Sequence, residues 1–575
     1  MPHSLRLALL PLLLALAVVL ALGSHYEAGD DTALTWLFSG VTAAAPVAAV
    51  PLYFHGYGHL LAAAYAAAPA VPWFGLLLGA LLLAATGLFF GVLATALRPH
   101  LRPGPLAAAL AAFFMVGWLE HWLWFSYVRV GLLLAAAAVL WAAQRPGRPG
   151  PLLLGLAGLL AAWALRPGLA VLSFVAVLPA AVLLAGGLRR AAPLLLGGAV
   201  LLAGATACLS LVQPPAAART RVLDSYLAAV LDYDQLTPTP RTPRDSLAVE
   251  ATRLWLLGDS TLTNAALYRR AYRFAPADYF GRVLPARLGQ RLGLLARDYF
   301  PLELALAATL LAAARLRGPT GRWFWLVQLA FAAGLLAFAG LLKLPPRAAL
   351  PRLDCWLLTN VLFLLKARVE TGQPGQPSGR AAPGLAAWLW PVRWQRRTLA
   401  AAAGLALGLY GAKTLHRRQV LQAEQARHEA VLTAVRKWPD GAVAVLGGAN
   451  DLGKSLSPFR PADLGRRPVL QLTGWPSHDA SQLALRQKLA STADLATCLR
   501  RVAAHASANA PHDPPRPWLL TPEVAAWLVR YLAGTVAWQP VRRAAIQNSR
   551  PTPEPPATQL TYYDLLPRPL PPPRP

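Results

Sequence analysis

The chain has 575 residues, of which 56% are hydrophobic and only 14% are charged, and its formal net charge at pH 7 is +28. This composition and a mean hydropathy of +0.42 exclude an ordinary soluble domain and indicate an integral membrane protein. The positive charge does not indicate nucleic-acid binding, because the basic residues lie at the ends of apolar segments and no basic run alternates with aromatic residues. We therefore expect anionic membrane lipids, and no nucleic acid, as partners of these residues.

Long apolar segments run through most of the chain, starting with 5–23. In lipid, the backbone satisfies its hydrogen bonds only in helices or closed barrels, and the sequence lacks the alternation of barrel strands. Segments of this length cross about 30 Å of hydrocarbon, so we predict an all-α polytopic protein with about eleven transmembrane helices. The predicted spans are 5–23, 71–97, 105–118, 123–143, 151–165, 168–186, 192–212, 301–314, 323–342, 350–365 and 398–415. A cleaved signal peptide is the alternative for the first segment, but its apolar run is longer than a usual signal core.

The distribution of Lys and Arg predicts the topology. Short loops that would be cytoplasmic with an inside N-terminus are richer in basic residues, as at Arg98, Arg102, Arg189 and Arg190, than the outer short loops. The N-terminus is therefore expected in the cytoplasm and the C-terminal region outside. The predicted organisation is a membrane region 1–212 with an outer loop 24–70, an outer helical loop 213–300, a second membrane region 301–415, an outer soluble α/β domain 416–549 and a Pro-rich disordered tail 550–575.

The first outer loop carries three carboxylates, Glu27, Asp30 and Asp31, close to the end of the first helix. A partly desolvated carboxylate there could act as a general base toward a hydroxyl, or two could hold a divalent cation. The alternative is that Asp31 caps a helix at 32–38 within an ordinary exposed loop. The residues alone leave both interpretations open.

Two histidines, His55 and His59, lie farther along this loop among aromatic residues. On a helix their spacing places them on one face, as in some metal sites. No carboxylate accompanies them on the same turn, and an amphipathic helix at the bilayer edge also explains the pattern.

Three further polar residues interrupt apolar segments at the predicted outer face. Arg166 lies between two spans, where a guanidinium could bind a lipid-linked phosphate, or could simply extend to the headgroups. Glu120 and His121 precede Trp122 in a tight outer turn. They could bind a substrate there, or could simply lie beside an interfacial aromatic belt.

The segment from Gly448 to Ser455 fits the phosphate-loop pattern and follows a strand-like stretch. A working phosphate loop opens a helix, but Pro458 and Pro461 would interrupt that helix within two turns. The predicted outer location also lacks ATP. We therefore predict that this segment binds no ATP.

The sequence GDDTALTWLFSG at 29–40, followed by VPWFG at 71–75, resembles a group of uncharacterised bacterial membrane proteins. The layout of a first helix, an outer Gly-Asp-Asp loop, many further helices and a soluble domain is similar to that of GT-C glycosyltransferases, which take sugars from polyprenyl-phosphate carriers. The resemblance implies a transferase of the bacterial cytoplasmic membrane that moves a sugar from a lipid-linked donor to an acceptor outside. It implies Asp30 or Asp31 as the catalytic base or as a ligand of Mg or Mn. The implied substrate-binding candidates are Arg166, Glu120, His121, His55 and His59.

Two other functions remain open. A secondary transporter or lipid flippase would carry ionisable groups at mid-membrane and Gly- or Pro-broken helices in repeated halves. The predicted spans are instead apolar through their centres, and the ionisable candidates gather at the outer face. A non-enzymatic envelope assembly protein would share the layout but tolerate loss of the carboxylates.

Overall fold

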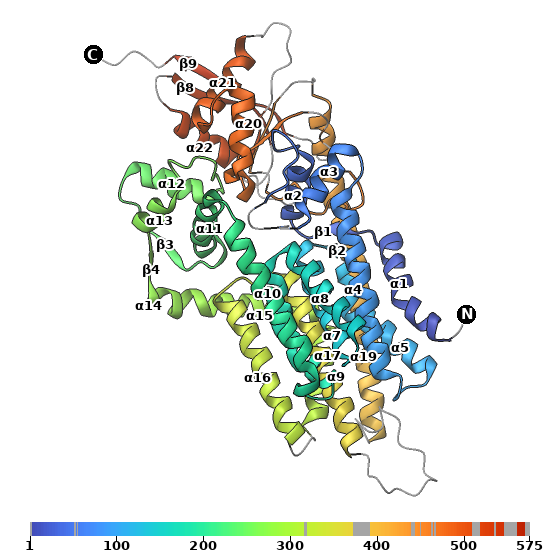
Figure 1. Ribbon diagram of the computed structural model, residues 1–575. Coiled ribbons are helices and arrows are strands. Elements are labelled where there is room, and N and C mark those ends of the chain that lie inside the picture. The colour runs from blue at the N-terminus through green and yellow to red at the C-terminus, as the bar shows by residue number, and fades with distance from the viewer. Residues whose placement is uncertain are drawn as a thin grey trace, which may run out of the picture.

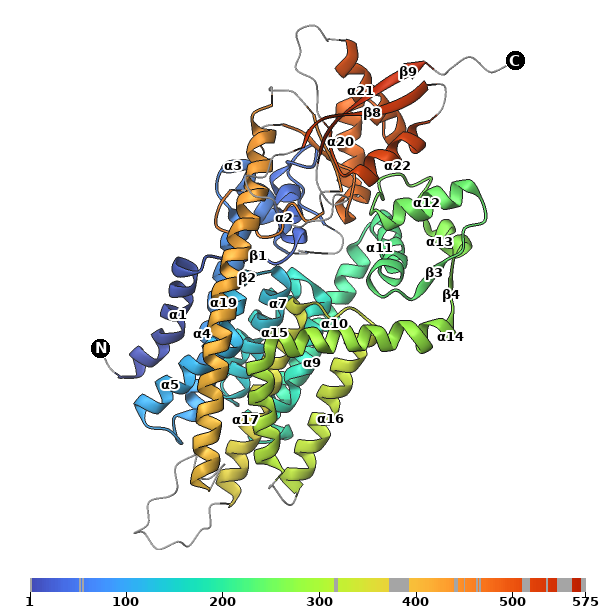
Figure 2. The same ribbon diagram turned by 180° about the vertical axis from the view of Figure 1, so that it is seen from behind.

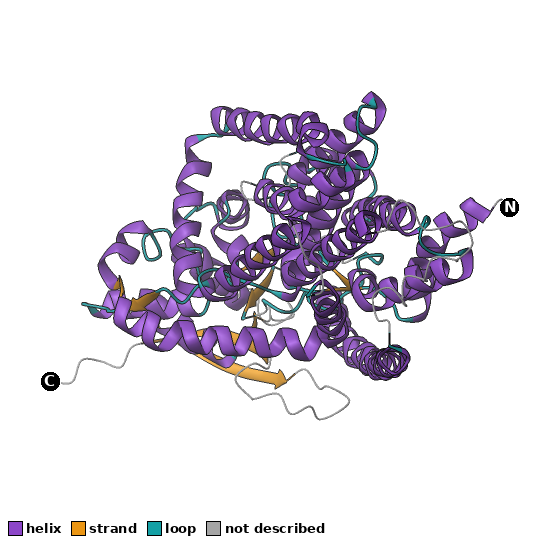
Figure 3. Cartoon of the chain, turned by 90° about the horizontal axis from the view of Figure 1, so that it is seen from below, coloured by secondary structure: helices purple, strands orange, loops and turns teal. Residues whose placement is uncertain are grey.

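The structure is a computed structural model, in which the described residues are 3–50, 53, 56–314, 319–371, 392–438, 443–448, 450–461, 464, 467–508, 518–533, 536–545 and 561–569. Helices run side by side in a long bundle. A small sheet and the segments around it lie at one end of the bundle (Figure 1). The view from behind shows the same arrangement (Figure 2). Seen from the end opposite the sheet, helices make up nearly all of the visible chain (Figure 3).

Seven helical stretches among the described residues are long and apolar enough to cross a membrane, which agrees with the predicted helical, multi-pass class. They are α4 (Trp73–Leu97), Pro103–Leu123, α9 (Pro167–Leu184), α10 (Leu188–Val212), most of α16 (Pro319–Gly340), most of α17 (Pro346–Thr371) and part of α19 (Arg393–Arg436). The stretch Pro103–Leu123 comprises α5 (Pro103–Phe113), the π-helix η1 (Phe114–Trp118) and α6 (Leu119–Leu123). The other predicted spans fall on α1 (His3–Ala21), α7 (Tyr127–Ala143), α8 (Pro149–Leu165) and α15 (Leu284–Ala313).

The short helix α7 forms the centre of the bundle, and all of its residues except Trp141 are buried. Two glycines of α8 allow α8 to approach it closely. A Cβ atom added at Gly155 or Gly158 would come within 2.5 Å of the Cβ atom of Ala142 or Ala138, respectively. Small residues at facing positions are the usual means of close helix packing in membranes.

Two long helices differ from the predicted spans. Helix α15 is kinked, with non-helical dihedral angles at Tyr299 just before Pro301. Its first half crosses the end of the bundle and its second half descends along the bundle (Figure 2). Helix α19 has 44 residues and runs from the far end of the bundle up to the sheet (Figure 2). The expected domain boundary at 416 therefore lies inside a continuous helix.

The C-terminal region contains a five-stranded sheet of order β6-β5-β7-β9-β8. Its strands are β5 (Ala444–Gly447), β6 (Val469–Gln471), β7 (Trp518–Leu520), β8 (Val536–Ala545) and β9 (Thr561–Pro569). Strand β5 is parallel to β6 and β7, whereas β9 is antiparallel to β7 and β8. The accompanying helices are η4 (Trp475–His478), α20 (Ala480–Ala490), α21 (Leu495–Ala508) and α22 (Pro522–Leu532).

Strand β9 lies within the segment that we expected to be a disordered tail. Thr561, Tyr562 and Tyr563 favour strands, and each pairs with a residue of β7 on one side and of β8 on the other. The expectation from proline content is therefore wrong for 561–569, because pairing on both sides supplies backbone hydrogen bonds that composition does not reveal.

The remaining elements lie at the same end of the bundle as the sheet (Figure 1). In the first loop and the α6–α7 connection these are β1 (His25–Tyr26), α2 (Gly29–Ser39), α3 (Gly58–Ala67) and β2 (Trp124–Phe125). Between α10 and α15 they are α11 (Pro215–Leu227), η2 (Ala228–Asp232), β3 (Leu236–Pro238), α12 (Pro243–Arg253), α13 (Ala265–Ala271), β4 (Tyr272–Phe274), α14 (Pro276–Asp278) and η3 (Tyr279–Val283).

The first loop is held between the bundle and the C-terminal region. Strand β1 pairs in parallel with β2, and the backbone of Tyr26 also bonds with that of Ser455 and of Leu456 at 2.8 Å each. Close approach continues at Gly29, where an added Cβ atom would lie 2.1 Å from the carbonyl oxygen of Asn450. The glycine of the Gly-Asp-Asp sequence is thus required by packing, and this packing fixes the start of α2.

Candidate functional site

Asp30 lies in the first turn of α2, and its carboxylate bonds with two other parts of the chain. Its Oδ2 lies 3.0 Å from Nη2 of Arg347, at the start of α17, and its Oδ1 accepts a hydrogen bond of 3.1 Å from Nε1 of Trp475 in η4. The side chain is 30% exposed. Asp30 is therefore a carboxylate that is fixed in orientation but still accessible.

Aromatic rings connect this carboxylate to Arg166. The guanidinium carbon of Arg166 lies 4.8 Å from the ring centroid of Tyr53, and its Nη1 donates a hydrogen bond of 3.2 Å to the hydroxyl of Tyr127. The ring of Tyr53 lies 5.3 Å from that of Tyr127 and 5.2 Å from that of Trp475. Arg166 thus stacks within the protein rather than only extending toward headgroups. We refer to the Asp30 cluster as Asp30, Arg347, Trp475, Tyr53, Tyr127 and Arg166.

Asp31 lies behind the cluster and is fully buried. Its Oδ1 accepts a hydrogen bond of 2.9 Å from the backbone amide of Tyr127. Burial raises the pKa of Asp31 to about 8, so this carboxyl is mostly protonated at neutral pH. The capping alternative is wrong, because the helix begins at Gly29 and its N-cap is Ala28. Of the two aspartates, only Asp30 has the exposure that contact with a substrate requires.

The raised pKa of Asp31 predicts a pH-dependent effect of Asp31→Asn on stability. The folded state keeps a proton that the unfolded chain releases near pH 4, so the wild type loses stability as pH rises from about 4 toward 8. Asparagine has nearly the same shape and can still accept the bond from Tyr127. We expect the variant to be more stable than wild type at pH 8, by on the order of 1 kcal/mol or more, since one pKa unit corresponds to about 1.4 kcal/mol. Thermal melting of the purified protein at pH 5 and pH 8 tests this, and an equal difference at both pH values would contradict it.

Glu120 and His121 are fully buried and belong to an internal ionic network. Nε2 of His121 lies 2.9 Å from Oδ2 of Asp354, and its Nδ1 lies 3.2 Å from Nη1 of Arg129. Oε1 of Glu120 lies 2.5 Å from Nη1 of Arg417. Their interpretation as decoration of an interfacial aromatic belt is therefore wrong, since both side chains point into the bundle.

The same network places ionisable side chains inside the ends of two predicted spans, 123–143 and 350–365. Asp354 lies in α17, within the predicted span 350–365, and is fully buried against His121. Arg129, in α7, continues the network through Nε to Oε2 of Glu27 at 2.7 Å. Ionisable side chains thus extend from the first loop into the bundle.

The two histidines of the first loop are not brought together among the described residues. His55 lies outside them, and His59 is exposed on α3. Over the described part of the chain, no group of three or more His, Cys, Asp or Glu residues is placed to hold a metal ion. Asp30 and Asp31 fit such an ion poorly, because both oxygens of Asp30 bond with Arg347 and Trp475, and Oδ1 of the buried Asp31 bonds with a backbone amide.

A histidine–aspartate pair beside the cluster was not predicted. Nε2 of His478 lies 2.9 Å from Oδ1 of Asp224 in α11. His478 ends the same 3-10 turn that begins with Trp475, and side chains three residues apart on such a turn project on the same side. The sequence showed Asp224 only as one of several scattered acids, and Arg347 only as a basic residue near a loop. Neither pattern reveals a partner hundreds of residues away.

The segment resembling a phosphate loop is packed against other elements. Residues 450–461 contain turns and no helix in their described part. Nζ of Lys454 lies 3.2 Å from Oε1 of Glu424, and the carbonyl oxygen of Gly453 accepts a hydrogen bond of 2.7 Å from Thr32. These contacts attach the loop to α19 and α2.

These observations define a helical, multi-pass membrane protein with a polar and aromatic cluster to which five segments contribute: the first loop, the start of α7, the α8–α9 connection, the start of α17 and η4. No family model, curated protein or solved structure matches the chain.

Proposed function

We propose that the protein is a GT-C-like glycosyltransferase that moves a sugar from a polyprenyl-phosphate carrier to an acceptor hydroxyl. The observation that carries the proposal is the Asp30 cluster, which combines an accessible carboxylate, two arginines and aromatic rings. A transferase of this class needs a base for the hydroxyl, cations for the phosphate and flat apolar surfaces for a sugar ring.

The proposed reaction assigns one role to each charged side chain. Asp30 accepts the proton of the acceptor hydroxyl while the hydroxyl oxygen forms a bond to the anomeric carbon. The bond between that carbon and the phosphate oxygen breaks, and its electron pair leaves with the polyprenyl phosphate. Arg166 binds the phosphate as its charge increases, and Arg347 orients Asp30 and adds a second positive charge.

The proposed location is the bacterial cytoplasmic membrane, with the N-terminus in the cytoplasm and the Asp30 cluster at the outer face. Eleven spans are proposed, comprising the seven long apolar stretches with α1, α7, α8 and the second half of α15. This topology places the first loop, the α11–α14 segment and the sheet on the side where the carrier presents its sugar.

Arg166→Gln tests the phosphate role directly. Hydrogen bonds to charged groups contribute roughly 1.5–3 kcal/mol, so we expect affinity for undecaprenyl phosphate to fall on the order of tenfold or more. Titration of the detergent-purified protein, followed by native mass spectrometry, measures this affinity. Arg148→Gln is the matched control, because Arg148 is exposed in another loop. Equal affinity of wild type and Arg166→Gln would remove Arg166 from the site.

A transporter or lipid flippase is a second candidate, favoured by the buried network of Glu27, Arg129, His121 and Asp354. Ionisable groups inside a bundle are typical of transport paths. Reconstituted vesicles containing fluorescent polyprenyl phosphate distinguish the two functions. Translocation that persists in Asp30→Asn but is lost in Asp354→Asn would favour transport over transfer.

A further inference from the structure

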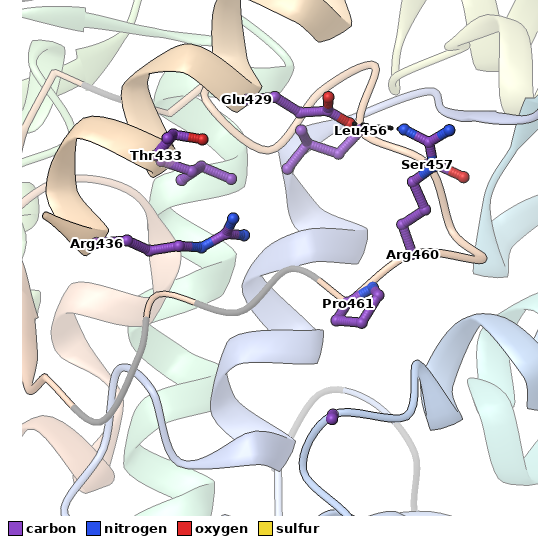
Figure 4. Close-up of a pocket in the computed structure, with 9 residues that line it drawn as sticks. Glu429, Thr433, Arg436, Leu456, Ser457, Arg460 and Pro461 are labelled. Carbon is purple, nitrogen blue, oxygen red and sulfur yellow. Dashed lines mark ion pairs between the residues drawn. The ribbon is translucent and has the colours of Figure 1, made fainter.

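A concave site lined by none of the residues of the Asp30 cluster lies between α19 and the loop 456–461 (Figure 4). Its volume is about 470 Å³. Helix α19 contributes Glu429, Thr433 and Arg436, and the loop contributes Ser457 and Arg460. We refer to this site as the α19 groove.

Among the described residues that line the α19 groove, two are arginines and one is a carboxylate, which favours an anion. Nη1 of Arg460 lies 3.7 Å from Oε1 of Glu429. The side chains of Arg460 and Glu429 are 70% and 40% exposed, so this ion pair is weak and a stronger anion can displace it. Figure 4 shows the Arg436 side chain extending across the groove from the helix, while Arg460 rises from the loop on the opposite side.

The polar groups beside the arginines match a phosphate. A phosphomonoester carries about −1.5 to −2 charges at pH 7 and three acceptor oxygens, which suits two guanidinium groups and additional hydroxyl donors. The hydroxyl of Ser457 accepts a hydrogen bond from the backbone amide of Phe459 and can still donate its own proton. Thr433 supplies a second hydroxyl, and Leu432 and Leu456 provide the apolar part of the lining.

The loop that carries Arg460 is firmly attached to the membrane helices. A Cβ atom added at Gly75, in the first turn of α4, would lie 1.7 Å from the carbonyl oxygen of Pro458. The ring of Phe459 lies 5.6 Å from that of Phe125. These contacts fix one wall of the groove on the bundle while α19 forms the other, so the backbone segments that carry the two arginines lie at opposite sides of the groove.

We propose that the α19 groove binds a phosphomonoester group through Arg436 and Arg460, with Glu429 occupying Arg460 when the groove is empty. The phosphate belongs either to a soluble sugar phosphate or to a lipid headgroup. This site is separate from the Asp30 cluster, and the proposal does not depend on the transferase function.

The test uses the full-length protein in nanodiscs and compares two phosphomonoester probes. Glucose 6-phosphate is the soluble probe, with glucose as its unphosphorylated control, and its binding is measured by isothermal titration calorimetry. Phosphatidic acid in phosphatidylcholine nanodiscs is the lipid probe, and its retention is measured by native mass spectrometry. Binding of one probe but not the other identifies the source of the phosphate.

Two variants with opposite expected effects make the assignment specific. Arg436→Gln combined with Arg460→Gln is expected to lower affinity for the bound probe by at least tenfold, since each substitution removes charge-assisted hydrogen bonds to the phosphate. Glu429→Gln is expected to raise the affinity several-fold, because it removes a competing carboxylate. Arg273→Gln combined with Arg500→Gln is the control for net charge, as both residues are exposed elsewhere.

The pattern of the variants decides the proposal. The proposal is supported if affinity for the probe falls in the Arg436→Gln, Arg460→Gln double variant, rises in Glu429→Gln and stays unchanged in the control. Failure of wild type to bind either probe would overturn it, as would equal loss in the control variant. If the double variant does not fold, Arg460→Gln alone and Glu429→Gln must still change affinity in opposite directions, and any other result overturns the proposal.

Discussion

Asp30→Asn is expected to reduce sugar transfer by about 10²–10⁴-fold, the range that a general base contributes. Asparagine preserves the shape of the side chain and can still accept the hydrogen bond from Nε1 of Trp475, so the cluster should remain assembled. It cannot take the proton of an acceptor hydroxyl. The measurement is the composition of envelope glycans in cells whose only copy of the protein carries the substitution, with protein level and membrane insertion checked against wild type.

The control for Asp30→Asn is Asp278→Asn. Asp278 bonds with Arg282 one helical turn away, and both side chains are substantially exposed. Loss of a glycan with Asp30→Asn but not with Asp278→Asn would support the role of Asp30 as the catalytic base. Wild-type glycan in both variants would remove Asp30 from catalysis and strengthen transport or a non-enzymatic assembly role.

The positions of the membrane helices could be read from the sequence because hydrophobicity is local information. Each predicted span overlaps a helix, since an apolar run in lipid has no alternative to helical hydrogen bonding. The lengths of the helices and the presence of strands were less predictable. Helix α19 continues beyond its apolar part because its polar half packs against the loop at 454–461, and strand β9 depends on β7 and β8. Both features rest on contacts between distant segments.

The candidate site was partly predictable for the same reason. Asp30 and Arg166 interrupt or border apolar segments, so each stands out in the sequence as a polar residue that needs an explanation. Arg347, Trp475 and the pair of Asp224 with His478 do not stand out, because their importance comes from the partners that folding brings to them. Asp354 was hidden inside an apolar segment whose average hydropathy conceals one carboxylate.

Arg129→Leu is expected to lower the free energy of unfolding by about 3–5 kcal/mol, the typical effect of removing one partner from a buried ion pair. Arg129 is fully buried, and its Nε lies 2.7 Å from Oε2 of Glu27. Leucine would leave the Glu27 carboxylate buried without its cation, and would also remove the contact with His121. Thermal melting of the detergent-purified protein measures the change, with Arg148→Leu, at an exposed position, as the control.

The double variant Glu27→Leu with Arg129→Leu tests whether the destabilisation in Arg129→Leu comes from leaving the Glu27 carboxylate without its cation. Replacing both partners of a buried ion pair by apolar residues is often nearly neutral, because no charge remains without a partner. We therefore expect the double variant to melt closer to wild type than Arg129→Leu does. Both variants lack Arg129, so a double variant that melts lower than Arg129→Leu would show that Glu27 stabilises the protein through contacts other than the one with Arg129. That result would contradict the explanation by an unpaired buried carboxylate.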